Sequence, residues 1–239
     1  MKTRHVLLTP VVLLALACSS STPEPRAAAE VNKDRSRAVA ELDDAARMLR
    51  DTASSMKIPL AQRQRAKCVL VSPSFVSGGL LVGASHGVGV VTCRTNARTG
   101  WSGPAFVDLS GGSAGLQAGL KSSDMVMLVN SDRVMSKLFA SALQLGVDAS
   151  VAAGPVGEAA MAETDVRMDA ELLTYAHSRG LFAGVDAGGV WVSQDTAASA
   201  ALYGPKADLR AILSGSVPIP KEAMGFLDQV RIAFPSGAK

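Results

Sequence analysis

The stretch AKCVLVSPSFVSGGLLVGASHGVGVVTCR, residues Ala66–Arg94, decides the fold. Short runs rich in valine and leucine alternate in it with glycine, serine and proline, a pattern typical of antiparallel strands joined by tight turns. Similar runs continue to Asn130, and half of the 22 glycines lie between Gly78 and Gly119. Because glycine permits bulges and close backbone contacts, the segment predicts a strongly curved sheet. Within it we expect GLQAGLKS and DMVMLVN to form two separate strands.

Helices are expected on both sides of this segment. Residues 31–56 carry apolar side chains at steps of three and four, which predicts an amphipathic helix. These apolar positions are Val39, Leu42, Ala46 and Leu49. A second helix is expected after a cap at Ser131 or Asn130. Three helices should close the chain, opening at an Asp195 cap, at Pro205 and at Pro220. The predicted class is therefore α+β, a curved antiparallel sheet or barrel-like sandwich flanked by N- and C-terminal helices.

The first residues resemble an export signal. A basic start and an apolar run of about a dozen residues precede Cys18, too short a run to span a bilayer. Cys18 after ALA resembles the lipobox of bacterial lipoproteins, and an ordinary signal cut after the same ALA is the alternative. We expect a signal at 1–17, a lipidated Cys18 opening a flexible tether at 18–30, and a domain at 31–235. The expected location is the periplasmic face of the outer membrane.

The charge balance limits the kinds of partner. Removal of residues 1–17 leaves 222 residues with 22 basic and 21 acidic side chains, a balance that argues against a nucleic-acid partner. The most basic segment is KIPLAQRQRAK, residues 57–67, which contains no acid. The helix at 31–56 also carries basic residues beside its apolar stripe. It is open whether that stripe lies on an anionic membrane or packs on the core of the domain.

Two cysteines remain after Cys18, namely Cys68 and Cys93. In an exported protein they can form a disulfide, worth about 3 kcal/mol in the chain-entropy model. Each also lies in an apolar run, where a buried free thiol is equally expected. The sequence leaves both states open.

Several motifs resemble catalytic or metal-binding patterns. GGSAG, with Ser113 at its centre, matches the nucleophile pattern of serine hydrolases, but no helix is expected after it, so a glycine-rich turn is favoured. His86 and His177 have no neighbouring ligands at a useful spacing. The acidic residues Glu158, Glu163, Asp165, Asp169 and Glu171 lack the spacing of a calcium loop. We therefore expect no catalytic residue, metal or cofactor.

Four blocks in order resemble the signature of the SYLF domain family: the opening stretch, GWSGPAFVDLSGGSAGLQAGLKSSDMVMLVNS, LGVDASVAAGPVG, and the segment from YAHSRGLFAGVDAGG to ALYG. The resemblance covers about Leu42 to Phe226. It implies a non-enzymatic domain that binds lipid through an N-terminal amphipathic helix. Here the implied ligand is an anionic phospholipid or membrane surface. The implied lipid-binding residues are Lys33, Arg35, Arg37, Arg47 and Arg50. The alternatives are an envelope scaffold that binds a protein partner and, more remotely, a serine esterase using Ser113.

Overall fold

The structure is a computed structural model of the 239-residue chain, and it describes residues 25–52, 58–79, 82–95, 100–114, 119–149, 151–153, 170–179 and 189–236. The predicted signal, Cys18 and most of the predicted tether lie outside the described residues. So do four of the five acidic residues tested for calcium and the turn expected at DAGG.

An eight-stranded sheet forms the centre of the domain, in the order β5-β8-β3-β2-β1-β4-β7-β6. All neighbouring strands are antiparallel except β6 and β7, which are parallel. The strands are β1 (Cys68–Gly79), β2 (Val82–Cys93), β3 (Ala105–Ala114), β4 (Gly119–Val129), β5 (Leu143–Gln144), β6 (Val151–Ala153), β7 (Leu172–Arg179) and β8 (Val190–Gln194). The predicted α+β class with a curved, mainly antiparallel sheet is confirmed.

Curvature enters the sheet through a bulge in β1, where the register shifts between Ser72 and Phe75. The Phe75 ring then packs over the next strand at Gly87. A Cβ atom on Gly87 would lie 2.9 Å from Cδ2 of Phe75, so only glycine fits this position without a shift of the ring. The glycine-rich pattern of the sequence thus has a steric cause at this point.

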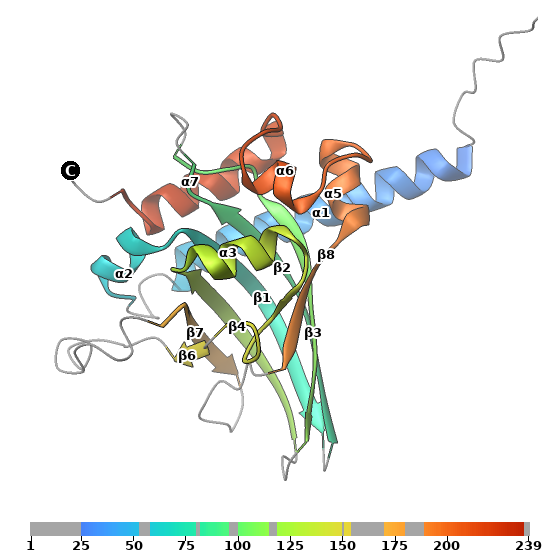
Figure 1. The fold of residues 1–239 in the computed structure, drawn as a ribbon. Coiled ribbons are helices and arrows are strands. Elements are labelled where there is room, and N and C mark those ends of the chain that lie inside the picture. Colours follow the sequence, from blue (N-terminus) through green and yellow to red (C-terminus); the bar gives the residue numbers. More distant parts are fainter. Residues whose placement is uncertain are drawn as a thin grey trace, which may run out of the picture.

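Helices cover both faces of the sheet (Figure 1). On one face α1 (Pro25–Thr52), α5 (Thr196–Tyr203), the 3-10 turn η1 (Lys221–Ala223) and α7 (Met224–Ala233) pack on a core that includes Val71, Val126 and Phe106. On the other face α3 (Asp132–Phe139) and α6 (Leu209–Leu213) pack on a core that includes Leu109 and Met127. A short helix, α2 (Leu60–Arg65), precedes β1. The far ends of β1 to β4 extend beyond the helices in Figure 1.

Several predicted boundaries differ from the structure. Helix α1 begins at Pro25, so the end of the expected tether is helical, because proline suits a first helical position and alanines follow it. The described part of GLQAGLKS, residues 119–122, is continuous with the run that begins at Asp124, and together they form one strand, β4, in place of the two expected. Pro205 does not open a helix, since α6 starts after an Asp208 cap whose carboxylate accepts a hydrogen bond from Ala211 N. The caps predicted at Ser131 and Asp195 are confirmed.

Candidate functional site

The predicted lipid-binding residues all lie on α1, which packs its apolar stripe on the sheet and on α7. Ala38, Leu42, Ala45 and Leu49 are buried in this interface. Spacings of three and four place them on one side of the helix. The apolar stripe therefore belongs to the core, which answers the question that the sequence left open. What remains for a ligand is the outer side of α1 and its first turns.

Two of the five predicted cations hold α1 to its neighbours. Arg35 forms an ion pair with Glu222 beside α7 and donates from Nη1 to the backbone oxygen of Ala201 at 3.1 Å. Arg37 pairs with Asp195 at 3.0 Å. The same Asp195 carboxylate caps α5 by accepting from Ala198 N at 2.9 Å. Both arginines thus stabilise the docking of the helix.

The other three cations face solvent. Arg47 pairs with Asp44 one turn away on the same helix. Lys33 and Arg50 are exposed and have no ion pair within the described part of the chain. Over its whole length α1 carries equal numbers of basic and acidic residues. The basic residues are Arg26, Lys33, Arg35, Arg37, Arg47 and Arg50, and the acidic ones are Glu30, Asp34, Glu41, Asp43, Asp44 and Asp51. The helix as a whole is not a strongly positive surface.

A cluster of three acids was missed in the sequence analysis. It consists of Glu41 on α1, Asp108 on β3 and Asp195 at the cap of α5. The pKa of Glu41 is raised to about 7, mainly by burial; Arg37 opposes the rise, and the nearby Asp195 and Asp108 add to it. Burial and Asp195 also raise the pKa of Asp108. One carboxylate oxygen of Glu41, Oε2, is buried without a hydrogen bond. A signal was present in the sequence, because Asp108 interrupts the apolar run of AFVDLS.

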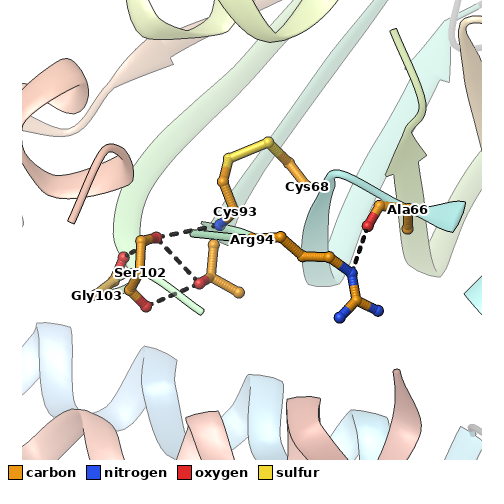
Figure 2. Close-up of a disulfide and its surroundings, with 7 residues drawn as sticks. Ala66, Cys68, Cys93, Arg94, Ser102 and Gly103 are labelled. Atoms are coloured by element: carbon orange, nitrogen blue, oxygen red, sulfur yellow. Dashed lines mark hydrogen bonds between the residues drawn. A yellow bond between two sulfur atoms is a disulfide. The ribbon is translucent and has the colours of Figure 1, made fainter. Parts of the chain in front are cut away.

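The two cysteines are joined in a disulfide between directly opposed positions of β1 and β2 (Figure 2). Ser102 fixes the backbone beside this bond. Its hydroxyl accepts from Cys93 N at 3.1 Å and donates to the oxygen of Gly103 at 2.8 Å. The Thr92 hydroxyl donates to the backbone oxygen of Ser102 at 2.9 Å. This network is buried, so the disulfide lies in the interior of the domain.

Arg94, next to the disulfide, was also missed, because a single arginine after a strand carries no sequence signal. Its Nε donates to the oxygen of Ala66 at 2.9 Å (Figure 2), and its Nη2 lies 3.2 Å from the oxygens of Arg63 and Phe234. The guanidinium stacks 4.5 Å from the ring centre of Trp101. Burial lowers the pKa of Arg94 below its ordinary value. One side chain thus joins α2, β2 and the end of α7.

The residues considered for catalysis are not brought together in the described part of the chain. Ser113 lies within β3, opposite Gly83, and the strand continues through it, so the strand-to-helix turn of a nucleophile elbow does not occur there. His86 is on β2 and His177 on β7, with β1 and β4 between them. Across the described residues no three His, Cys, Asp or Glu side chains are grouped to hold a metal ion. Glu171 pairs instead with Arg133.

The fold and these sites define the chain as an α+β domain with a curved sheet covered by helices on both faces. Comparison with known proteins then gives the family: residues 110–233, more than half of the chain, match the family described as "Ysc84: Las17-binding protein actin regulator". The chain belongs to this family, which is the one that the SYLF resemblance indicated. No solved structure matches the chain.

The curated relatives support the same assignment. The chain is 35% identical over 154 residues to the human SH3 domain-containing YSC84-like protein 1, covering 63% of this chain and 44% of that protein. It is 31% identical over 169 residues to Protein YSC84 of Saccharomyces cerevisiae, covering 70% of this chain and 36% of that protein. LAS seventeen-binding protein 3 of the same yeast is 32% identical over 166 residues. The chain spans less than half the length of these relatives.

Proposed function

We propose that this chain is a non-enzymatic domain that binds the surface of an anionic phospholipid membrane. The proposal includes export, cleavage of residues 1–17 and a lipid anchor on Cys18 at the periplasmic face of the outer membrane. The domain then extends from Pro25, where α1 begins, to about residue 235. No described helix is long and apolar enough to cross a bilayer.

The observation that carries the proposal is the projecting start of α1. In Figure 1 its first turns extend past the sheet, away from the body of the domain. Every residue from Ala28 to Lys33 is exposed, and Val31 is 54% exposed. The same exposed turn of α1 carries the aliphatic Val31 and the basic Lys33, residue types that suit the boundary between headgroups and acyl chains. We call residues 25–33 the α1 arm.

The position of the α1 arm agrees with the proposed anchor. Six residues lie between Cys18 and Pro25, so seven steps along the chain join them, and extended chain spans at most about 3.5 Å per step. A lipid on Cys18 would therefore hold Pro25, where the α1 arm begins, within about 25 Å of the bilayer. The disulfide supports export, because such bonds persist in oxidising compartments and are rare in the cytosol.

The test is sedimentation of the chain from Ser19, which lacks the proposed lipidation site, with vesicles of phosphatidylglycerol and phosphatidylethanolamine or of neutral phosphatidylcholine. Enrichment on the anionic vesicles that falls with added salt is expected. Within α1, Lys33→Glu with Arg50→Glu should weaken binding without unfolding, since neither cation holds the helix. Equal, salt-independent binding to both vesicles would remove the lipid proposal.

A protein partner is the second candidate, because related yeast and vertebrate proteins carry names that refer to Las17 or to SH3 domains. In that case the domain would act as an envelope scaffold and show no preference among vesicles. The esterase alternative is tested by Ser113→Ala, which should leave any background ester hydrolysis unchanged.

A further inference from the structure

The most basic segment of the chain is not part of α1. Residues 58–67, IPLAQRQRAK, contain Arg63, Arg65 and Lys67 and no acidic residue. They form α2 and its connection to β1. Figure 1 places α2 at the end of the domain where α7 finishes, opposite the projecting start of α1. The segment thus forms a separate positive surface.

Hydrogen bonds hold α2 firmly against the end of α7. Arg63 donates from Nη1 to the oxygen of Ala233 at 3.1 Å. Arg94 reaches the oxygens of Arg63 at 3.2 Å, Phe234 at 3.2 Å and Pro235 at 3.1 Å. Ile58, which precedes α2, and Gln62, within it, are both buried. The surface is therefore preformed by the fold.

Two large aliphatic side chains are exposed on these elements. Leu60 opens α2 and is 50% exposed, and Ile232 near the end of α7 is 71% exposed. Ile232 directly precedes Ala233, whose oxygen binds Arg63, and Leu60 lies three residues before Arg63 on the same side of α2. Leu60 is thus one turn from the arginine that joins the two helices, and Ile232 is next in sequence to the residue that this arginine binds.

Four cations at this end of the domain contact backbone oxygens or exposed carboxylates. Arg63 and Arg94 bond to backbone carbonyls, so these contacts bring no carboxylate to offset their charge. Lys67 pairs with Asp132, and Arg231 pairs with Asp228 at 2.6 Å, both between partly or largely exposed side chains. Exposed pairs of this kind contribute little and can exchange their carboxylate for a phosphate.

We infer that α2 and the end of α7 form a second contact surface for an anionic phospholipid bilayer, with Leu60 and Ile232 entering the headgroup boundary and the surrounding cations binding lipid phosphates. We call this surface the α2–α7 rim, made of Leu60, Arg63, Arg65, Lys67, Arg231 and Ile232. An exposed aliphatic pair among cations is the combination that binds at a lipid interface. The inference rests on the proposed function and adds a site that α1 does not contain.

Contact at both surfaces orients the domain. Helix α1 has 28 residues and is about 42 Å long, with the α1 arm at one end and the rim beyond the other. Binding through both would lay α1 along the bilayer. The two contacts would then act together, since the second becomes intramolecular once the first has formed.

The experiment uses the chain from Ser19 and the same two vesicle types. The rim variants are Arg65→Glu with Lys67→Glu, and Leu60→Asp with Ile232→Asp. Arg63 and Arg94 are left intact because they hold the fold. The control variants change exposed residues elsewhere. The charge control is Lys206→Glu with Arg210→Glu, at and just before α6. The aliphatic control is Val147→Asp, since Val147 is 70% exposed. Near-UV circular dichroism and thermal midpoints check folding.

Because each basic residue near an anionic surface contributes about a factor of five, the charge variant should bind at least roughly 30-fold more weakly and with a smaller salt slope. The aspartate variant should lose binding while the controls retain it. If the rim variants bind anionic vesicles as strongly as the wild type does, this inference is overturned and the proposed function still stands. No anionic preference in the wild type would overturn both. Stronger rim-dependent binding to soluble polyglutamate than to vesicles would identify a protein site and also overturn the inference.

Discussion

Replacing Glu41 by glutamine should stabilise the domain, and the gain should depend on pH. In the folded state burial raises the pKa of Glu41 from 4.5 to about 7. The folded protein therefore holds a proton that the unfolded chain releases between these pH values. The stability that neutral Glu41 contributes is complete below pH 4.5 and is lost as the pH rises through 7. Glutamine remains neutral and avoids this loss.

The size of the effect follows from the shift. Each pKa unit corresponds to 1.36 kcal/mol, so a rise from 4.5 to about 7 sets an upper limit of about 3.4 kcal/mol. Because Glu41 is only partly buried, solvent screening reduces the expected gain to about 1–2 kcal/mol at pH 8. Near pH 4.5 wild type and Glu41→Gln should differ by less than about 0.5 kcal/mol.

The assay is urea unfolding of both proteins at pH 4.5, 6, 7 and 8, with the free energy of unfolding plotted against pH. Asp43→Asn is the matched control, since this acid lies two residues further along α1 and is exposed. Its effect should be small at every pH. A difference between wild type and Glu41→Gln that stays constant from pH 4.5 to 8, or a loss of stability in the variant at pH 8, would refute the reasoning.

Three further results are expected. Reducing the Cys68–Cys93 disulfide should lower the free energy of unfolding by about 3 kcal/mol, measured by urea unfolding with and without reductant, and an unchanged midpoint would contradict a structural role. Arg94→Ala should lower the free energy of unfolding by about 2–3 kcal/mol, because the backbone oxygens that Arg94 binds lose their donor. The α2 segment should then become open to protease or to amide exchange before the sheet does. Protection of α2 equal to that in the wild type would argue against the hydrogen bonds described above. Gly87→Ala should cost about 1–3 kcal/mol in thermal or urea unfolding, because its new Cβ meets the neighbouring phenylalanine ring, whereas Gly225→Ala, with open space around it in α7, should be neutral or stabilising by up to about 1 kcal/mol.

The sheet could be predicted from the sequence because its signals are local. Valine-rich runs, glycine punctuation and a serine or aspartate before a helix each act within a few residues, and the caps at Ser131 and Asp195 were predicted for this reason. The predicted ends of helices were less accurate where two local signals compete. Pro205 suits a first helical turn, yet Asp208 supplies the cap that starts α6.

The sites were harder to predict because their contacts join distant parts of the chain. The cations of α1 suggested a free basic face, but Glu222 and Asp195, which pair with Arg35 and Arg37, are more than 150 residues away in the sequence. The contacts of Arg94 with the end of α7 are equally remote. Such pairings depend on the packed arrangement of helices on the sheet, which periodicity does not encode.

The packing of α1 against α7 also has a consequence for the order of events during synthesis. Helix α1 meets one of its packing partners, α7, only when residues 224–233 have been made, since Phe226, Leu227 and Val230 line the same core as Leu42 and Leu49. A growing chain emerges from the ribosome with the apolar stripe of its first helix uncovered. Loss of α7 would leave the part of that stripe that faces it uncovered. Translation that stops before α7 should thus yield a chain that aggregates or is degraded, whereas a chain that includes α7 covers this part of the stripe.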